Sequence, residues 1–519
     1  MPRGDVKVEL IPPIRGVRTD LPAHLVPDGY LLGGSNVICR DGRILVRPGY
    51  TDLTSAAPSN NRVMGGVYYK DFSETQQVLI GTISGFQQYT GAGWVDVTGT
   101  TLTGNADQQV RFTVFPFSNS TRLIAVNDKD VPQSWLGTGT FAALGGNPPV
   151  AKCAAVAFQR VVLGNVTVGG TRRSSALWIS GFQDPTDWSA VREVNLTDTK
   201  DSIVEVRALN AQSFAIYKEN SQWVGLGAGG IFPFIFELRD QQAGPVSPAS
   251  VVQAEKQQYY VGLDGDIYQF DGNACQPIGG TVKRLIQSGI DWTNARRTHG
   301  FYDQLNREIW WFWPSGDEAG VTGGVVYRLP YGDVPGAFSP LMRYGREISA
   351  SFNWLDLSRT TWDELTGTWD SISTPYPTWD SFQRVGRPGD LIGDNTGQVY
   401  RFGTAAGDAG ATFDAEFDFP FRPVAGPGEL ILVDTVESYF KQASSFYNVS
   451  IILLTNNTMA TVGTPELTQV VDISQDIKHR VTFYNVLSRF ISLRHRMSNT
   501  LGLQEYRGGV GWFWKRSEG

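Results

Sequence analysis

One short pattern recurs between residues 81 and 403 and restricts the fold more than any other feature of the chain. It reads GTISGFQQYTG at 81–91, GLDGDIYQFDG at 262–272 and GDNTGQVYRFG at 393–403. In each copy an apolar run ends in glycine, a glycine-containing turn follows, and the next segment closes on aromatic residues. Glycine suits such turns because hairpin turns need a positive φ, which glycine adopts without steric cost. The pattern predicts repeated β-hairpins with one internal layout.

Weaker relatives of this hairpin lie between the three copies, for example at 121–137, 174–190 and 213–227. Roughly six units of about 45–60 residues fit between residues 60 and 405, a period typical of propeller blades. Strand-rich repeats of this length predict a β-propeller, whose radial closure leaves few strand edges exposed. A string of unrelated β-sandwiches is the alternative.

The first 50 residues have a different character. Prolines divide short apolar pieces, and NVICRDGRILVRPGY at 36–50 predicts a hairpin that turns at Asp41-Gly42. We expect this N-terminal arm to add a strand to a neighbouring domain or subunit.

Beyond about residue 410 apolar and polar residues alternate. Phe413, Phe417, Phe419 and Phe421 all fall on odd positions, and several strand-like segments follow with short polar turns between them. Alternation with a period of two is typical of half-buried antiparallel strands, so this region predicts a separate β-sandwich.

These observations together predict an all-β fold class. The expected domains are an extended N-terminal arm with its hairpin at 1–50, a β-propeller of about six blades at 51–405, and a C-terminal antiparallel β-sandwich at 406–519. Helix is scarce, and the best candidate is GGTVKRLIQSGI at 279–290.

Charge and cysteine content exclude several classes of protein. Charged residues make up 18% of the 519 residues, and the net charge of −7 argues against the basic surface of a DNA-reading domain. A protein that DNA merely passes is not excluded. The three cysteines are scattered, which argues against a disulfide framework or a zinc site. The N-terminus has charges and prolines where a secretory signal needs an apolar core, and no apolar run of about 18 residues occurs. We expect no membrane span and synthesis in a reducing cytosol.

Motifs that carry chemistry are not found. His24, His299, His479 and His495 have no partners at metal-ligand spacing, so we expect them on the surface or on strand faces. GLGAGG at 225–230 precedes a strand, whereas a phosphate-binding loop opens a helix. The P-loop pattern and the G-x-S-x-G elbow are absent. We predict no catalytic, cofactor-binding or metal-binding residue, no cofactor and no enzymatic activity.

Two groups of carboxylates are candidates for a glycosidase site, since a glycosidase needs two such groups at the scissile bond. The first is Asp184 with Asp187; the second is the run TWDELTGTWDSISTPYPTWDSF at 361–382, which contains Trp-Asp three times. An Asp on a strand or turn more often caps local structure. WD repeats recur about every forty residues, so spacings of seven and ten are too tight for that signature. We interpret the run as a loop-rich scaffold segment, with a carbohydrate-binding aromatic patch as the alternative.

Several longer stretches resemble virion proteins of tailed bacteriophages. They are GVRTDLPAHLVPDGYLLGGSNVICRDGRILVRPGY at 16–50, the segment from FAIYKENSQWVGLG to YYVGLDGDIYQFDG at 214–272, the Trp-Asp run before LIGDNTGQVYRFG, and the strand-rich, arginine-containing tail. This group includes the nozzle or hub proteins of short-tailed phages. The resemblance implies a propeller-bearing subunit assembled as a ring, commonly of six copies, below the portal and the head-to-tail adaptor. It brings no catalytic residues with it.

The leading hypothesis is therefore a structural protein of the phage tail, made in the host bacterial cytoplasm, that extends the DNA ejection channel. Its implied partners are further copies of itself, as a homohexamer, the adaptor, tail fibre, spike or needle proteins, and double-stranded DNA that passes without sequence-specific binding. The runner-up is a receptor-binding or fibre-attachment protein that recognises host surface glycan, and a propeller glycan hydrolase is third. In a conduit we expect acidic lumen loops, with Arg480, Arg494, Arg496, Arg507, Lys515 and Arg516 away from the pore.

Overall fold

The computed structural model describes residues 5–10, 15–40, 42–59, 61–73, 75–117, 120–228, 233–317, 320–356, 387–423, 430–440, 448–456, 464–472, 478–488, 490–500 and 505–516. The Trp-Asp run at 361–382 lies outside these residues. It belongs to the connection between two neighbouring strands of one sheet, because Asp356 and Arg387, which flank it, are partners in an antiparallel ladder.

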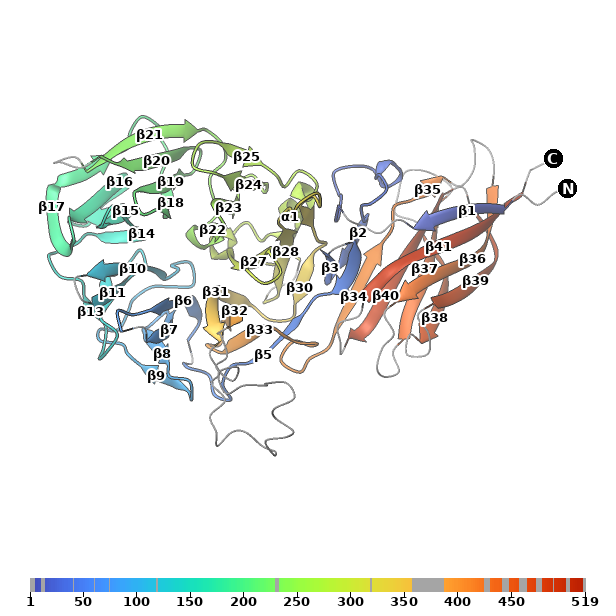
Figure 1. Ribbon diagram of the computed structural model, residues 1–519, viewed down its shortest axis with the longest axis horizontal. Helices are drawn as coiled ribbons and strands as arrows, with labels where there is room; N and C mark the ends of the chain where they lie inside the picture. Colours follow the sequence, from blue (N-terminus) through green and yellow to red (C-terminus); the bar gives the residue numbers. More distant parts are fainter. Residues whose placement is uncertain are drawn as a thin grey trace.

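Seven sheets follow one another along the chain and surround a common axis, which makes a seven-bladed β-propeller (Figure 1). Within each blade the strands pair antiparallel with their neighbours, and the first strand lies nearest the axis. The strands of the first four blades are β6 (Val63–Lys70), β7 (Gln76–Thr82), β8 (Phe86–Tyr89), β9 (Trp94–Asp96); β10 (Arg111–Phe117), β11 (Ser120–Val126), β12 (Gln133–Trp135), β13 (Ala142–Ala143); β14 (Val150–Ala157), β15 (Arg160–Val168), β16 (Thr171–Gly181), β17 (Asp184–Asn195); β18 (Ile203–Asn210), β19 (Ser213–Lys218), β20 (Gln222–Gly227) and β21 (Phe234–Asp240).

The last three blades complete the ring. Their strands are β22 (Val252–Ala254), β23 (Gln257–Val261), β24 (Ile267–Phe270), β25 (Cys275–Pro277); β26 (His299–Asp303), β27 (Glu308–Pro314), β28 (Thr322–Arg328), β29 (Ala337–Phe338), β30 (Met342–Tyr344); β31 (Ile348–Asp356), β32 (Arg387–Asp394), β33 (Val399–Ala405) and β5 (Gly49–Asp52). The sixth blade carries β30 as an additional strand beside β28.

The recurring sequence pattern corresponds to one structural element. Each of the three copies joins the second strand of a blade to the third, in blades one, five and seven. The glycine that ends each copy has a left-handed backbone: φ is 89° at Gly91, 94° at Gly272 and 80° at Gly403. A side chain at these positions would be strained, which explains why glycine recurs there. The prediction of repeated hairpins from this pattern is confirmed.

The ring has one blade more than the expected number of about six. The fifth blade, Val252–Pro277, is much shorter than the expected unit. The seventh blade takes its outer strand from the N-terminal arm, so its residues are not contiguous in sequence. Because of these two features, dividing the sequence into equal, contiguous repeats predicts too few blades.

The outer strand β5 closes the propeller. It pairs with β33, with Tyr50 opposite Phe402, and the ring of Tyr50 packs edge-on against Tyr400 with the centroids 4.9 Å apart. Gly49 allows this approach, because a Cβ there would lie 2.0 Å from the carbonyl oxygen of Gly407. The first and the last parts of the propeller sequence are thereby held in one sheet.

The C-terminal region forms a β-sandwich of two six-stranded sheets, to which the arm also contributes. One sheet contains β1 (Asp5–Leu10), β3 (Val37–Arg40), β4 (Arg43–Val46), β36 (Leu430–Phe440), β39 (Lys478–Ser488) and β41 (Glu505–Arg516). The other contains β2 (Gly33–Ser35), β34 (Phe413–Asp418), β35 (Arg422–Pro423), β37 (Asn448–Asn456), β38 (Thr464–Asp472) and β40 (Phe490–Thr500). The expectation that the arm adds strands to a neighbouring domain is confirmed, since β1 and β4 pair with β41 and β2 pairs with β34.

Helix is rare in the described part of the chain. Its α-helix is α1 (Lys283–Gly289), inside the predicted 279–290, and three single turns of 3-10 helix are η1 (Ala23–Leu25), η2 (Pro248–Ser250) and η3 (Ala295–Arg297). α1 buries Ile286 against the core that blades five and six share with the sandwich. Within the described residues, no helix has the length and apolar character needed to cross a membrane.

A buried arginine joins the sandwich to the propeller. Arg47 follows β4, its side chain is 0% exposed, and it forms a bidentate ion pair with Asp408, at 2.6 and 2.8 Å. Its remaining N–H groups donate to the side-chain oxygen of Asn36 and to the carbonyl oxygens of Pro48 and Arg343. The guanidinium also lies 4.0 Å from the ring centre of Tyr344 and 3.8 Å from that of Phe413. Every donor of the guanidinium therefore has a partner.

We expect Arg47→Met to lower the free energy of unfolding by about 3–5 kcal/mol, because it leaves the buried Asp408 carboxylate without its cation. The measurement is urea denaturation of the full chain. Arg173→Met is the matched control, since Arg173 is 41% exposed in its pair with Glu193 and such pairs contribute at most about 1 kcal/mol. The double variant Arg47→Met/Asp408→Asn is expected to recover part of the loss. Equal effects of the two single substitutions would contradict this role of Arg47.

Candidate functional site

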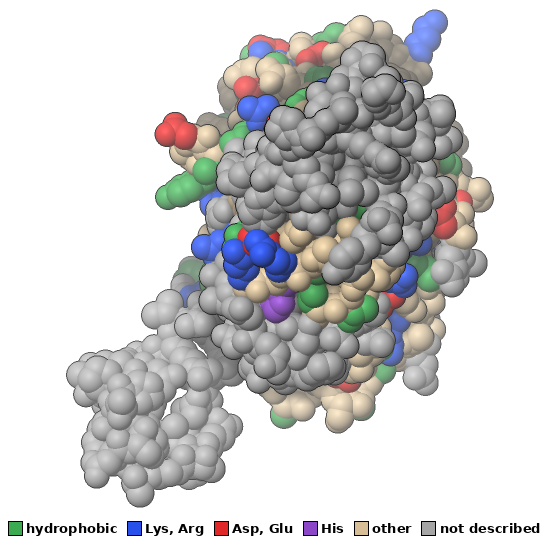
Figure 2. All heavy atoms as spheres, turned by 90° about the vertical axis from the view of Figure 1, so that its right-hand side faces the viewer, with side chains coloured by type: hydrophobic (Ala, Val, Ile, Leu, Met, Phe, Trp, Pro, Cys, Tyr) green, Lys and Arg blue, Asp and Glu red, His purple; other side chains and the backbone are tan. Residues whose placement is uncertain are grey.

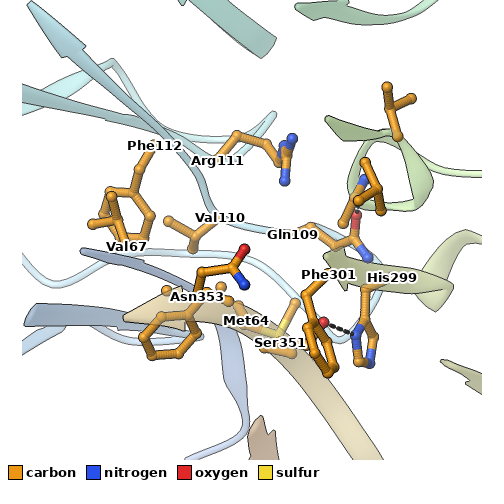
Figure 3. Close-up of a pocket in the computed structure, with 18 of the residues that line it drawn as sticks. Met64, Val67, Gln109, Val110, Arg111, Phe112, His299, Phe301, Ser351 and Asn353 are labelled. Atoms are coloured by element: carbon orange, nitrogen blue, oxygen red, sulfur yellow. Dashed lines mark hydrogen bonds between the residues drawn. The ribbon is translucent and has the colours of Figure 1, made fainter. Parts of the chain in front are cut away.

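A cavity of about 270 Å³ lies on the axis of the propeller (Figure 3). Its wall is formed by the innermost strands of six blades, and Figure 3 shows side chains from these strands converging on it. The described lining residues include Gln109, Arg111, Arg207, His299 and Asn353, and no carboxylate is among them. The axial cavity is thus polar and carries positive charge.

Glycines allow the inner strands to approach one another around this cavity. A Cβ at Gly65 would lie 2.2 Å from the carbonyl oxygen of Val110, and one at Gly66 would lie 2.1 Å from the ring of Phe352. A Cβ atom essentially never lies so close to another heavy atom, so a larger residue at either position would force neighbouring blades apart. The paired glycines of β6 therefore set the width of the cavity at the first blade.

His299 on β26 is buried between blades six and seven and is neutral. Its Nε2 lies 3.2 Å from the carbonyl oxygen of Ile348, so Nε2 must carry the proton and donate it. Nδ1, 2.8 Å from Ser351 Oγ, then accepts from that hydroxyl, the contact drawn in Figure 3. Burial, with a smaller effect of the Arg62 charge, lowers the pKa of His299 to about 4. This histidine joins two blades and is not available as a base at the cavity surface.

Positive charges outnumber negative charges at the other side of the cavity. Glu205 on β18 is 1% exposed and lies 3.4 Å from the guanidinium of Arg111. Lys152 and Arg207 also act on Glu205 electrostatically. Burial raises the pKa of Glu205, and these cations oppose that shift. Burial, together with Arg111, lowers the pKa of Arg207 to about 10, so Arg207 is still charged at neutral pH.

A second hollow, a cleft of about 480 Å³, lies where blades six and seven meet the β3–β4 hairpin of the sandwich. Its lining includes Leu305, which is 63% exposed, the indole of Trp310, and two aspartates, Asp303 and Asp390. The side chain of Asn306 and its backbone N–H hold Asp303. The cleft therefore combines the exposed apolar surface of Leu305 with two carboxyl groups.

Asp390 is only 7% exposed, yet just one of its oxygens is engaged. Oδ1 accepts a hydrogen bond of 2.7 Å from the Asn353 amide, and no other hydrogen bond or ion pair reaches this carboxyl group within the described residues. Burial raises the pKa of Asp390 well above its usual value, and the charge of Asp303 adds to this shift. In its protonated form a carboxyl group can both donate and accept a hydrogen bond.

The carboxylates that the sequence singled out have local structural roles. Asp184 accepts from the backbone N–H and the hydroxyl of Thr186, and Asp187 pairs with Arg192, all around the start of β17. Neither lines the axial cavity or the cleft. Hydrogen bonds from Thr186 lower the pKa of Asp184, as expected for a carboxylate that caps a turn.

The other residues considered for metal or thiol chemistry are mostly buried. His299 and His495 are at most 2% exposed, His479 is 8% exposed, and His24 is partly exposed. Strand faces were expected for the histidines, and His299, His479 and His495 occupy them; the burial was not foreseen. Among the described residues no group of three or more His, Cys, Asp or Glu side chains could hold a metal ion. Cys39, Cys153 and Cys275 are buried free thiols, and burial raises the pKa of each.

Basic residues of the C-terminal region are held in ion pairs on the sandwich. Figure 2 faces that end of the molecule and shows one small group of Lys and Arg side chains beside acidic ones. Lys478 and Arg480 both pair with Glu437, whose side chain is 1% exposed. Arg494 pairs with Asp418 and Arg496 with Asp414. The side chains of Arg507, Lys515 and Arg516 lie outside the described residues.

Sequence reasoning did not find the arginines of the axis or the aspartates of the cleft. A signal for the first was available: Glu205 and Arg207 sit at alternate positions of the otherwise apolar run IVEVRAL at 203–209. Two charges on one face of an apolar strand indicate a buried polar cluster. Asp303 and Asp390 have no such local signal, because they come from different blades.

Comparison with known proteins leaves the chain unassigned to a family. No protein family matches the sequence, and no curated protein matches it. Among the solved structures that match is one described as YCF48 bound to D1 peptide, with 10% identity and a TM-score of 0.35. The match covers 69% of this chain and 98% of that one. A similarity of this size adds nothing to what the sheet order already shows.

The buried histidine makes stability depend on pH. The unfolded chain binds a proton at His299 near pH 6.5, whereas the folded chain does so only near pH 4. Between these values the unfolded state holds more protons, so stability falls as pH falls from about 6.5, by up to about 3 kcal/mol for this group.

His299→Gln keeps a donor for Ile348 and an acceptor for Ser351, and is expected to flatten this pH dependence in urea denaturation at pH 7, 6 and 5. His24→Gln, a change at a partly exposed site, is the control and should leave the slope unchanged. An unchanged slope in His299→Gln would show that other groups cause the acid sensitivity.

Proposed function

We propose that the protein is a structural subunit of the tail of a tailed bacteriophage, a nozzle- or hub-like component of a ring. The ring extends the DNA ejection channel below the portal and the adaptor and anchors receptor-binding appendages. This proposal starts from the resemblance of residues 16–50 and 214–272 to such virion proteins, and three features of the structure support it.

The first support comes from what the resembling residues do. Arg47, Gly49 and Tyr50 of the segment VRPGY hold the sandwich to the propeller and close the seventh blade. These are scaffold roles. A sequence resemblance carried by residues with scaffold roles is what we expect among structural proteins, and it does not require catalytic chemistry.

The second support is the free edge of the sandwich, and it is the observation that carries the proposal. Among the described residues β38 pairs with β37 alone, and Thr468, Gln469 and Val470 on it are exposed, Val470 by 57%. An open strand with an exposed β-branched residue offers its backbone N–H and C=O groups to another chain. Contacts between unlike surfaces of identical copies generate rings when the rotation closes.

The third support is the electrostatic character of the sandwich. Arg480, Arg494 and Arg496 are each paired with a carboxylate, and the net charge of the chain is −7. Unpaired Lys and Arg would hold phosphates through counterion release. Pairing of these three arginines reduces such contacts on the described part of the sandwich, which suits a conduit along which DNA slides.

We expect Val470→Lys to impair assembly, because a charge on the edge strand opposes pairing with another chain. The measurement is the amount of this protein in purified phage particles when the variant is supplied in place of the wild type, together with its position by cryo-electron microscopy. Ile235→Lys, an equally exposed position on the outer strand of the fourth blade, is the control and should assemble normally. Normal incorporation of Val470→Lys would exclude the edge as the contact, and absence of the wild-type protein from the tail would refute the function.

A second function, recognition of a host surface glycan, is favoured by one observation, the cleft with Asp390. Saccharide sites combine aromatic or apolar surface with a few polar groups that bond to hydroxyls. The exposed side chain of Leu305 supplies the apolar surface, and the free oxygen of Asp390 supplies the polar group. In its protonated form this carboxyl group matches a hydroxyl, which both donates and accepts.

The test is calorimetric titration of the full chain with a panel of neutral disaccharides. Asp390→Asn should retain binding, because the amide replaces a neutral acid, whereas Asp390→Ala and Leu305→Glu should abolish it. Leu263→Glu, at an exposed leucine of another blade, is the control. Absence of binding across the panel, or binding that Leu305→Glu leaves intact, would rule out this cleft as the glycan site.

A further inference from the structure

Arg207 is a cation without a partner on the axis of the propeller. It lines the axial cavity, and within the described part of the chain it makes no hydrogen bond and no ion pair within 4 Å. Glu205, two residues before it on the same strand, is engaged by Arg111 instead. A guanidinium that is partly withdrawn from bulk water is destabilising unless an anion compensates it.

The charges around this point do not cancel. Arg111, Lys152 and Arg207 face the single carboxylate of Glu205. The opposite wall supplies uncharged groups, with Asn353 and Gln253 among the lining residues and His299 held neutral by its burial. The cavity therefore has an excess of positive charge.

We propose that the axial cavity binds a small oxyanion, such as a phosphate or a carboxylate, between Arg111 and Arg207. The guanidinium group presents its N–H donors in a planar fork that matches two oxygens of either anion. A volume of about 270 Å³ is small for a drug-sized molecule and leaves room for an ion of this kind. The inference is independent of the proposed tail function, because it concerns the interior of one propeller.

The test uses the full-length protein and compares sodium phosphate, sulfate and citrate with sodium chloride at equal ionic strength. We expect the oxyanions to raise the thermal midpoint and to give saturable binding by calorimetry, since a ligand that binds only the folded state stabilises it. The titration with phosphate tests for an inorganic anion, and the titration with citrate tests for a carboxylate ligand.

Arg207→Met should weaken oxyanion binding at least about tenfold. In chloride alone this variant should be as stable as the wild type or more stable, because it removes an unpaired charge; loss of stability in chloride would contradict the inference. Arg284→Met is the matched control, an exposed arginine on α1, and should bind as the wild type does. The proposal is overturned if no oxyanion stabilises the wild type more than chloride does, or if Arg207→Met keeps the full response.

Discussion

The whole arrangement depends on one buried guanidinium. Arg47 is fully enclosed, and its five N–H groups meet Asp408, Asn36 and the carbonyl oxygens of Pro48 and Arg343. Its partners come from the arm, the sixth blade and the segment that leads into the sandwich. A charge buried at this depth is tolerated only when every donor is satisfied, so the relative position of the two domains is restricted to one in which all these groups meet. The bidentate pair of Arg40 with the buried Glu308 adds a second fixed point on the same hairpin.

The N-terminal arm joins the two domains, because it contributes strands to both of them. Strands β1 to β4 belong to the sandwich, and the next strand, β5, completes the propeller. The apolar core follows the same path, because Val37 and Ile44 of the arm lie in one buried cluster with Trp311 of the sixth blade and Phe417 of the sandwich. A hinge between the domains would have to break this cluster as well as the ion pairs. We infer that the two domains form one rigid body.

Local patterns in the sequence were sufficient for the class of fold. Hairpin glycines such as Gly272 and alternation such as that of Phe413 and Phe417 report on neighbours a few residues away, and those predictions hold. Features that depend on distant residues were not accessible. Arg47 and Asp408 are 361 positions apart, and the number of blades depends on a strand borrowed from the arm. The candidate sites could not be predicted for the same reason. The free oxygen of Asp390 and the missing partner of Arg207 depend on which distant residues surround them in the folded protein, and no short stretch of sequence contains that information.

The closure of the seventh blade also determines how the chain reaches its native state. β5 is synthesised some 350 residues before its partner β33, and β1 is likewise made long before its partner β41. Contacts of such long range form slowly, because the entropy of closing the loop is lost before any contact rewards it. Until β33 and β41 are made, β5 and β1 therefore have no partner, and the β3–β4 hairpin lacks the elements that cover apolar residues such as Val37 and Ile44. Such surfaces are prone to aggregation until their partners have been made, so closure of the seventh blade and completion of the sandwich come late in folding.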